Sequence, residues 1–166
     1  MGLAVVVAVD SECGIGKGGD LPWRIPADMA HFKSITVGNG SNAVIMGRTT
    51  WESIPERFRP LKDRVNIVLS RRGVEVPEGV LVATSLAEAL ERAGNADEVC
   101  AIGGAQVYAE AMAHPRCAAL YITRVAGSFD CDTFFPDWKD DYRCDRVLAE
   151  GESGGHHYRV ELWRRA

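Results

Sequence analysis

The stretch Leu3-Ala4-Val5-Val6-Val7-Ala8-Val9 decides the fold class of this chain. It is a continuous, valine-rich apolar run, and a run of this length is typical of a strand that is buried on both faces of a parallel sheet. Similar short runs recur further along, so we expect strands at Ala43–Met46, Val65–Leu69, Val80–Ala83, Val99–Ile102 and Leu120–Val125.

Segments with helical periodicity lie between these runs, at Pro26–Ile35, Thr50–Ile54, Ser85–Ala93 and Ala105–Ala113. Strands that alternate with helices predict an α/β domain with a mostly parallel central sheet and flanking helices. The end of the chain differs, because Tyr142–Glu150 and His157–Arg164 flank the glycine-rich segment 151–155. This pattern predicts a C-terminal antiparallel hairpin at the sheet edge, with a connection longer than a tight turn.

Length and composition favour an ordinary globular protein. The 166 residues are 46% apolar and 25% charged, which predicts one domain over residues 1–166. The net charge of −4 argues against nucleic-acid binding. There is no apolar stretch of membrane-spanning length, and no basic segment precedes Leu3–Val9 as it would in a signal peptide. Five cysteines without a C-x-x-C pair predict reduced thiols, no metal site and a cytoplasmic location.

Ligands of open α/β sheets bind at the carboxyl ends of the strands, so the segments after each strand are informative. Gly103-Gly104 follows one predicted strand and begins a helix, which is typical of a phosphate site. Gly47-Arg48-Thr49-Thr50 and Ser70-Arg71-Arg72 place hydroxyl and guanidinium groups at two more strand ends. Each segment alone also fits an ordinary turn or a solvated charge. Together they favour an extended ligand with a pyrophosphate and one more phosphate.

Asp28 is the most informative carboxylate. On the predicted helix it lies within an arc of about 120° that also holds Ile25, Met29, Phe32 and Ile35. A buried lone carboxylate is costly unless it has a cationic or donor partner, and in a pocket that partner can be a ligand. An acid in the first turn also complements the helix dipole, and the pattern alone leaves both interpretations open.

Three further features have both a functional and a structural interpretation. The glycine-rich segment 14–20 is followed by Leu21-Pro22-Trp23, and together they form either a mobile lid or a plain surface loop. Arg64 is either a surface arginine or a fork for a substrate carboxylate. His156 and His157 lack companion ligands for a metal, and we expect Trp51 and Trp163 to be packing residues.

The chain resembles the dihydrofolate reductase family over essentially its whole length. Seven segments carry the resemblance, in the right order and spacing: Gly14-Ile15-Gly16 with Asp20-Leu21-Pro22-Trp23; Pro26-Ala27-Asp28; Val44-Ile45-Met46-Gly47-Arg48-Thr49-Thr50-Trp51-Glu52-Ser53-Ile54-Pro55; Arg59-Pro60-Leu61; Asn66-Ile67-Val68-Leu69-Ser70-Arg71; Ile102-Gly103-Gly104-Ala105-Gln106-Val107-Tyr108; and Asp132-Thr133-Phe134-Phe135-Pro136.

The resemblance implies NADPH-dependent reduction of 7,8-dihydrofolate to 5,6,7,8-tetrahydrofolate, with hydride transfer to C6 and protonation at N5. It implies that Asp28 binds N3 and the 2-amino group of the pterin, that Thr123 supports this carboxylate, and that Leu21 and Trp23 complete the catalytic set. The implied substrate contacts are Val6, Val7, Ala8, Asp28, Met29, Phe32, Lys33, Ile54, Leu61, Arg64, Ile102, Tyr108 and Thr123. Among them, Arg64 resembles the residue that binds the glutamate α-carboxylate.

The resemblance likewise implies a set of NADPH contacts, including a Gly103-Gly104 turn that carries an unusual cis peptide bond in this family. The set comprises Ala8, Ile15, Gly16, Lys17, Gly19, Asp20, Leu21, Gly47, Arg48, Thr49, Thr50, Leu69, Ser70, Arg71, Arg72, Ile102, Gly103, Gly104, Ala105, Gln106, Val107 and Tyr108. The family also implies antifolate binding, a monomer and no metal. Thr84 stands where some relatives carry a basic residue near the 2′-phosphate.

Two alternatives are weighed against this assignment. A reductase of the same fold that acts on a riboflavin-pathway pyrimidine would not need Arg64, which suits a substrate with a glutamate tail. A degenerate module that only senses NADPH would not need Asp28 or the lid residue Trp23, and both are present. The sequence therefore favours the dihydrofolate reductase activity.

Overall fold

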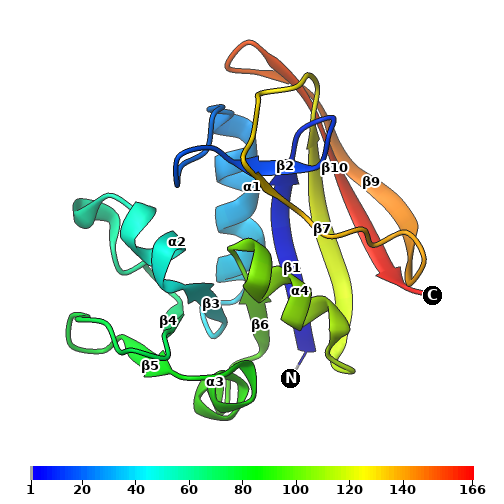
Figure 1. The fold of residues 1–166 in the computed structure, drawn as a ribbon. Coiled ribbons are helices and arrows are strands. Elements are labelled where there is room, and N and C mark those ends of the chain that lie inside the picture. Colours follow the sequence, from blue (N-terminus) through cyan, green and yellow to red (C-terminus); the bar gives the residue numbers. More distant parts are fainter. Residues whose placement is uncertain (1) are drawn as a thin grey trace.

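A twisted eight-stranded sheet runs through the computed structural model, which describes residues 2–166 (Figure 1). The strand order is β5-β4-β3-β6-β1-β7-β10-β9. Every neighbouring pair from β5 to β7 is parallel, while β10 pairs antiparallel with both β7 and β9. The bounds are β1 Gly2–Val9, β3 Ala43–Gly47, β4 Val65–Leu69, β5 Leu81–Ala83, β6 Glu98–Ala101, β7 Cys117–Val125, β9 Tyr142–Ser153 and β10 His156–Arg165. The predicted α/β fold with a C-terminal antiparallel hairpin is confirmed.

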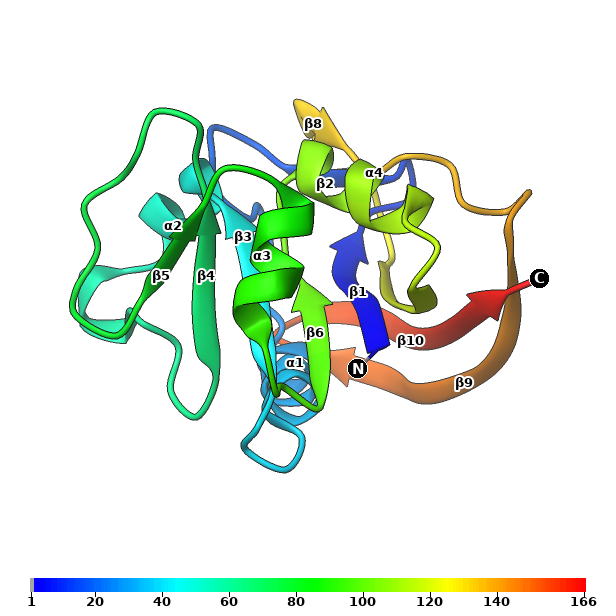
Figure 2. The same cartoon turned by 90° about the horizontal axis from the view of Figure 1, so that it is seen from below.

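Within residues 2–166, four α-helices flank this sheet, with α1 on one side and α3 and α4 on the other (Figure 2). They span Pro26–Val37 (α1), Arg48–Ser53 (α2), Leu86–Ala93 (α3) and Ala105–Ala113 (α4), and a short 3₁₀ helix covers Glu56–Phe58. Two small strands, β2 Gly14–Gly16 and β8 Thr133–Phe134, pair with each other outside the main sheet. Among the described residues, no helix has both the length and the apolar character that a membrane span requires.

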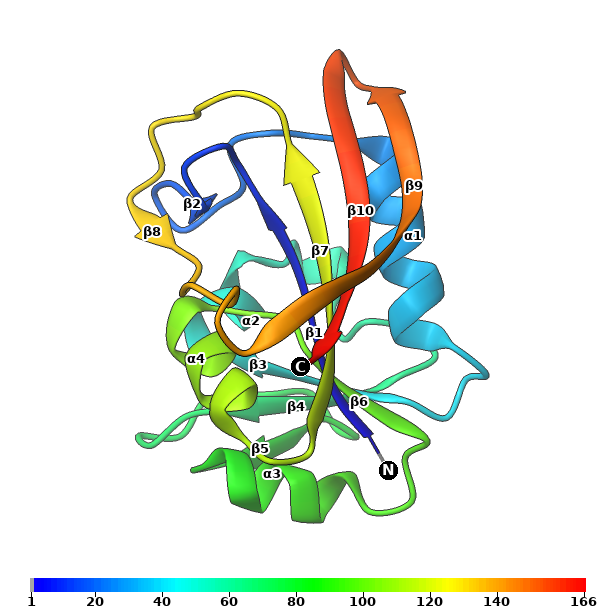
Figure 3. The ribbon, with the colours of Figure 1, turned by 90° about the vertical axis from the view of Figure 1, so that its right-hand side faces the viewer.

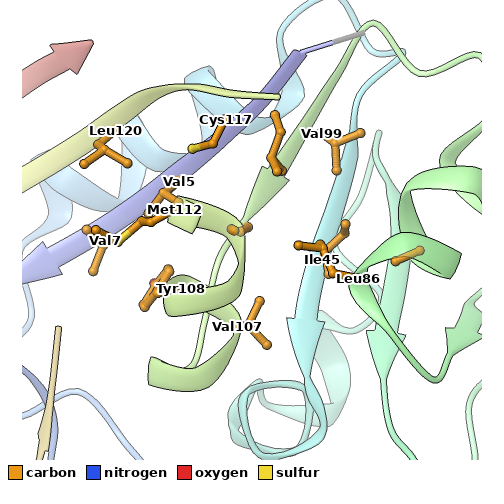
Figure 4. Close-up of a cluster of buried hydrophobic side chains, with 14 of the residues drawn as sticks. Val5, Val7, Ile45, Leu86, Val99, Val107, Tyr108, Met112, Cys117 and Leu120 are labelled. Carbon is orange, nitrogen blue, oxygen red and sulfur yellow. The ribbon is translucent and has the colours of Figure 1, made fainter. Parts of the chain in front are cut away.

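The first strand shows why its sequence is apolar throughout. Successive side chains of a strand point to opposite faces. Val5 and Val7 therefore pack with α4 on one side of the sheet, in the cluster that Figure 4 shows around Val107, Tyr108 and Met112. Val6 joins a second cluster on the other side. Because both faces are covered, no position on β1 favours a polar side chain.

The C-terminal hairpin corrects one prediction. β9 continues to Ser153 and β10 begins at His156, so only Gly154 and Gly155 connect them, and the expected longer connection is wrong. Both glycines have positive φ, 60° and 82°, which a two-residue turn of this kind requires. The sequence assigns Gly151 to the connection, but in the structure it pairs with Tyr158 inside the hairpin.

The tip of this hairpin reaches the start of α1 (Figure 3). No side chain of the preceding segment caps the helix, but Ser153 Oγ accepts a hydrogen bond from the backbone N–H of Ala27 at 3.1 Å. A distant element thus provides a cap for the helix that bears Asp28.

The two predicted packing tryptophans behave as expected. Trp51 is buried, and Trp163 packs edge-on against Trp138 with ring centroids 5.6 Å apart. All five cysteines are free in the structure.

Candidate active site

A large open cleft of about 1850 Å³ lies at the carboxyl ends of the parallel strands. The ends of β1, β3 and β4 line it, together with the segment that follows β6 and with residues of α1, α2 and α4. This is where a parallel α/β sheet is expected to bind its ligand.

Asp28 and Thr123 form the acid end of this cleft, which we define by these two residues with Val6 and Tyr108. Asp28 is in the first turn of α1, and Thr123 Oγ1 donates a hydrogen bond to Asp28 Oδ1 at 2.6 Å. Burial raises the pKa of Asp28, whereas the Thr123 hydrogen bond and the charge of His31 act in the opposite direction. The site therefore holds an oriented carboxyl group that protonates more readily than an exposed aspartate.

The residues of the apolar arc predicted around Asp28 lie partly in the core and partly in the cleft. Ile25 is buried, and Phe32 and Ile35 pack against the cluster that contains Val6. Met29 lines the cleft instead and is 54% exposed. The helix thus places an acid, an aromatic ring and a flexible thioether side chain along one wall.

Tyr108 contacts both the acid end of the cleft and the hydrophobic core. Its hydroxyl donates a hydrogen bond to the carbonyl oxygen of Val6 at 3.0 Å, and its ring packs edge-on against Phe135. Burial raises the pKa of this phenol, so Tyr108 stays neutral. The contact fixes α4 against the strand that lines the pocket.

Gly103 and Gly104 form a close approach between β6 and the start of α4. The peptide bond between them is cis, as the resemblance implied, and Gly103 has a φ of 136°. A Cβ at Gly103 would lie 3.0 Å from Thr50 Oγ1, and the Gly103 carbonyl oxygen accepts a hydrogen bond from Gly47 N at 2.8 Å. Only glycine fits there, which leaves backbone and the N-terminus of a nine-residue helix facing the cleft.

Basic and hydroxyl side chains line the opposite end, which we call the phosphate end and define by Arg48, Ser70, Arg71 and Thr84. Arg48 forms an exposed ion pair with Glu52 one turn later on α2, at 3.2 Å. Ser70 Oγ donates to the Gly73 carbonyl oxygen at 3.0 Å. These contacts are local and exposed, so a phosphate group can replace them at small cost.

The lid segment lies over the cleft and is tied to the β7–β8 connection. Gly18 N donates to Asp132 Oδ2 at 2.9 Å, and Asp132 N donates to the Gly16 carbonyl oxygen at 2.9 Å. Leu21 is 55% exposed over the cleft, whereas Trp23 is buried and packs edge-on against Phe129 at 5.2 Å. The lid segment is therefore anchored at Gly16, Gly18 and Trp23, while the apolar side chain of Leu21 is exposed beside the cleft.

Arg64 faces the cleft beside the 3₁₀ helix. Its Nη1 donates to Thr36 Oγ1 at 2.9 Å, and its Nε donates to the Lys62 carbonyl oxygen at 2.7 Å. Burial lowers its pKa, and Arg64 forms no ion pair with any residue of 2–166. An oriented cation of this kind suits a ligand carboxylate.

The structure brings nearly all of the predicted site residues together. Every predicted substrate contact lines the cleft, and so do all predicted cofactor contacts except Lys17 and Arg72. Lys17 pairs through its backbone with Asp20 in the lid, and Arg72 lies exposed in the bend next to Ser70. Among residues 2–166 there is no cluster of side chains with the spacing of a metal site.

Sequence reasoning missed several residues of the site. Additional residues that line the cleft are Arg24, Ile25, His31, Ser53, Pro55, Arg57, Phe58, Arg59, Pro60, Lys62, Asp63, Ser85, Glu110, Tyr121 and Thr133. His31 was detectable by its spacing, since it follows Asp28 by one turn on the same helix.

Asp10, beneath the lid, was also missed. Its carboxylate accepts hydrogen bonds from the backbone N–H groups of Glu12, Gly14 and Phe129. Burial acts to raise its pKa, but these amides together bring the pKa below its ordinary value. Asp10 thus joins the base of the lid to the β7–β8 connection as an anion.

Comparison with known proteins agrees with the geometry. The family model described as "Dihydrofolate reductase" matches residues 2–165. The chain is 45% identical over 172 residues to the dihydrofolate reductase of Drosophila melanogaster, which covers 95% of this chain and 94% of that protein. It is also 47% identical over 147 residues to the enzyme of Rattus norvegicus (81% and 79%) and 47% identical over 150 residues to that of Schistosoma mansoni (83% and 81%).

Proposed function

The chain belongs to the dihydrofolate reductase family, oxidoreductases of folate metabolism, and from this premise we propose that it reduces 7,8-dihydrofolate to 5,6,7,8-tetrahydrofolate with NADPH. One observation carries the proposal: Asp28, a half-buried carboxyl oriented by Thr123, lies in the same cleft as a glycine turn at a helix N-terminus and a basic end. The first feature suits an amino-substituted ring and the others suit a pyrophosphate ligand.

The substrate ring is proposed to bind at the acid end. Asp28 accepts hydrogen bonds from N3 and the 2-amino group, an arrangement in which two parallel donors meet two carboxylate oxygens. Thr123 fixes one of these oxygens, so the carboxylate does not have to reorient when the ring binds. The backbone and side chains of Val6, Val7, Ala8 and Ile102 form the surrounding wall.

The rest of the substrate is proposed to extend toward Arg64. Met29, Phe32, Ile54 and Leu61 line the intervening wall and offer apolar surface to an aminobenzoyl ring. Arg64, already oriented by Thr36, then binds the glutamate α-carboxylate through two parallel hydrogen bonds.

The residues present fit a dinucleotide of the NADPH type. Gly103 leaves space where a Cβ would approach Thr50, and the N-terminus of α4 offers free N–H groups to a pyrophosphate. Arg48, Ser70 and Arg71 would hold the ribose phosphate at the other end. When bound, NADPH supplies the hydride.

Two parts of the chain are proposed to act on the proton that N5 receives. When it is ionised, Asp28 places a negative charge beside the ring, and this charge raises the pKa of that ring. The exposed side chain of Leu21, which follows the lid turn, is proposed to close over the cleft and exclude bulk solvent, so that a single water can deliver the proton.

The proposal includes further features of the protein. We infer that it is a one-domain monomer, that it works in the cytoplasm as its cysteine pattern indicates, and that antifolates with a cationic 2,4-diaminopyrimidine ring bind against Asp28. The monomeric state is checked by analytical ultracentrifugation of the purified chain.

The activity is tested by mixing the purified chain with NADPH and dihydrofolate and following the loss of the NADPH absorbance. Rapid loss that requires both compounds, together with recovery of tetrahydrofolate, is expected. Asp28→Asn is the matched variant, because it keeps the side-chain shape and removes the charge. No turnover by the native chain, or turnover with a pyrimidine lacking a glutamate tail and not with dihydrofolate, would overturn the proposal.

A further inference from the structure

His31 is a titratable group of the cleft that the proposed mechanism does not use. It lies three residues after Asp28 on α1, so the two side chains share a helix face. Both residues line the same cleft. The Nε2 atom of His31 is buried and has no hydrogen-bond partner within residues 2–166. Buried polar atoms in folded proteins are nearly always paired, so this nitrogen indicates a function that packing alone does not explain.

The charges of His31 and Asp28 act on each other. Burial lowers the pKa of His31, and the negative charge of Asp28 raises it by a smaller amount. A positive charge on His31 in turn lowers the pKa of Asp28, which burial raises. The protonation of each group therefore depends on the charge of the other.

The other groups near this wall do not replace Asp28 as the partner of His31. From β7, Thr123 is uncharged and is bonded to Asp28, and burial raises the pKa of the Tyr121 phenol, which keeps it neutral. Arg64 is bound to Thr36 further along α1. Among the described residues, Asp28 supplies the charge that acts on the imidazole.

The geometry points to His31 as a positioning residue that acts through Asp28: because the two share one helix face and one cleft wall, a protonated imidazole and a protonated ligand ring compete for the same carboxylate charge. His31 therefore loses its proton when a cationic ring binds, and it leaves Asp28 free to pair with that ring. The relevance to catalysis rests on the proposed function, since it requires a substrate ring that is protonated during the reaction.

Proton release on ligand binding tests this competition without requiring turnover. Calorimetry in buffers of different ionisation enthalpy counts the protons that leave when a 2,4-diaminopyrimidine binds. At an acidic pH at which part of the His31 imidazole of the ligand-free chain is protonated, as its own NMR titration shows, His31→Gln should release fewer protons than the native chain, by up to about one. At about pH 8 a histidine is neutral both with and without ligand, so the native chain and His31→Gln should release the same number of protons.

His157→Gln is the matched control, since His157 is an exposed histidine on β10 that faces Glu152. It should leave the proton count unchanged at both pH values. His31→Phe, which keeps a planar ring, should reproduce the Gln result if His31→Gln folds poorly. Native and His31 variants that release equal numbers of protons at the acidic pH would overturn the inference.

NMR titration of the His31 imidazole in the ligand-free protein gives an independent measurement. Asp28→Asn removes the charge that raises the His31 pKa, so the imidazole should titrate at lower pH in this variant. An unchanged His31 titration would show that the two groups are not coupled. The NMR titration requires no turnover. A failure of the inference can therefore be distinguished from a failure of the proposed function.

The reaction itself gives the last measurement. In the native chain, kcat/KM for dihydrofolate should carry an acid-side contribution from His31 that is missing in His31→Gln, so the ratio of native to variant kcat/KM should change with pH. A histidine that only packs would change the rate by the same factor at every pH, and that outcome would contradict the inference.

Discussion

The acid end and the phosphate end of the cleft are built in different ways. At the acid end, Asp28, Thr123 and Tyr108 are held by contacts between distant parts of the chain, in a partly or fully buried setting. At the phosphate end, Arg48 and Ser70 make only local contacts to Glu52 and Gly73 and are not buried. The acid end is therefore pre-organised, and the phosphate end takes its final arrangement from the ligand. Buried charges interact more strongly than solvated ones, so substitutions should cost more at the acid end.

Asp28→Asn should have the largest effect. The substitution preserves size and removes the negative charge, so the variant cannot favour a protonated ring. Loss of such assistance costs roughly 10²–10⁴-fold in the rate of hydride transfer at neutral pH. The loss should shrink on acidification, because the substrate then arrives already protonated from solution.

Pre-steady-state rates of hydride transfer over a range of pH, with NADPH saturating, provide the measurement. The variant rate should rise steadily as pH falls, while the native rate levels off. A variant profile that runs parallel to the native one would mean that Asp28 only positions the ring.

The double variant Arg48→Ala/Arg71→Ala should come next. Hydrogen bonds to charged groups contribute roughly 1.5–3 kcal/mol each, so removing both should weaken NADPH binding by about 10²-fold or more. NADH, which has no 2′-phosphate, should bind almost unchanged. Equilibrium binding measured by fluorescence at two salt concentrations checks this, because the exposed contacts should weaken with salt whereas contacts at the acid end should not.

Equal losses for the two cofactors would remove these arginines from the 2′-phosphate site. Arg72→Ala is the internal control: this exposed arginine follows Arg71 directly but does not line the cleft, so it should change neither affinity.

Arg64 shares features with both ends of the cleft: it is partly buried, but it lacks an ion pair among residues 2–166. Arg64→Leu should weaken dihydrofolate binding by about 1.5–3 kcal/mol, which is the contribution of hydrogen bonds to a charged group. A dihydropterin without the glutamate tail should bind the native chain and the variant equally. The comparison of KM values for the two substrates decides the point, because a similar loss with the truncated pterin would indicate a structural role.

The burial that prepares Asp28 for its ligand also has an effect on stability. The folded state raises the pKa of Asp28, so the folded protein binds this proton more tightly than the unfolded chain does. Stability from this group is present below the unfolded pKa and is lost as pH rises through the folded pKa. The ligand-free Asp28→Asn variant should therefore be more stable than the native chain at neutral pH, with the difference vanishing in acid. Thermal unfolding as a function of pH measures it; a variant that is less stable than native at neutral pH would contradict the sign.

The parts of this molecule that sequence could predict depend on local patterns. The valine run of β1 predicts a strand covered on both faces. The isolated acid on an apolar helix face makes Asp28 a candidate for the site but fits a helix-dipole acid as well. Gly103-Gly104 between a strand and a helix indicates a phosphate site only in combination with the other strand ends, because alone it fits an ordinary turn.

Features that depend on distant partners could not be predicted. The carboxylate of Asp10 binds the backbone of Phe129, which is 119 residues later, and nothing near Asp10 indicates that contact. The strand pairing of Gly151 with Tyr158 outweighs the turn preference of its glycine-rich neighbours. Ser153 likewise has no local pattern that marks it as a helix cap for Ala27.

Ser153→Ala should have the smallest effect, and it tests how far the acid end depends on the C-terminal hairpin. Ser153 Oγ accepts a hydrogen bond from Ala27 N in the first turn of α1, next to Asp28. Loss of a helix cap typically costs about 0.5–2 kcal/mol, and a partly exposed cap from another element should lie near the lower bound. The free energy of unfolding in urea should fall by that amount, and Ser128→Ala, which changes an exposed serine of the β7–β8 connection, should leave it unchanged. Because α1 carries Asp28 and not the basic residues of the phosphate end, the variant should raise KM for dihydrofolate slightly and leave NADPH affinity as it was. Equal changes in the two ligands would show that the hairpin supports the whole cleft, and the two ends would then be less independent than their contacts indicate.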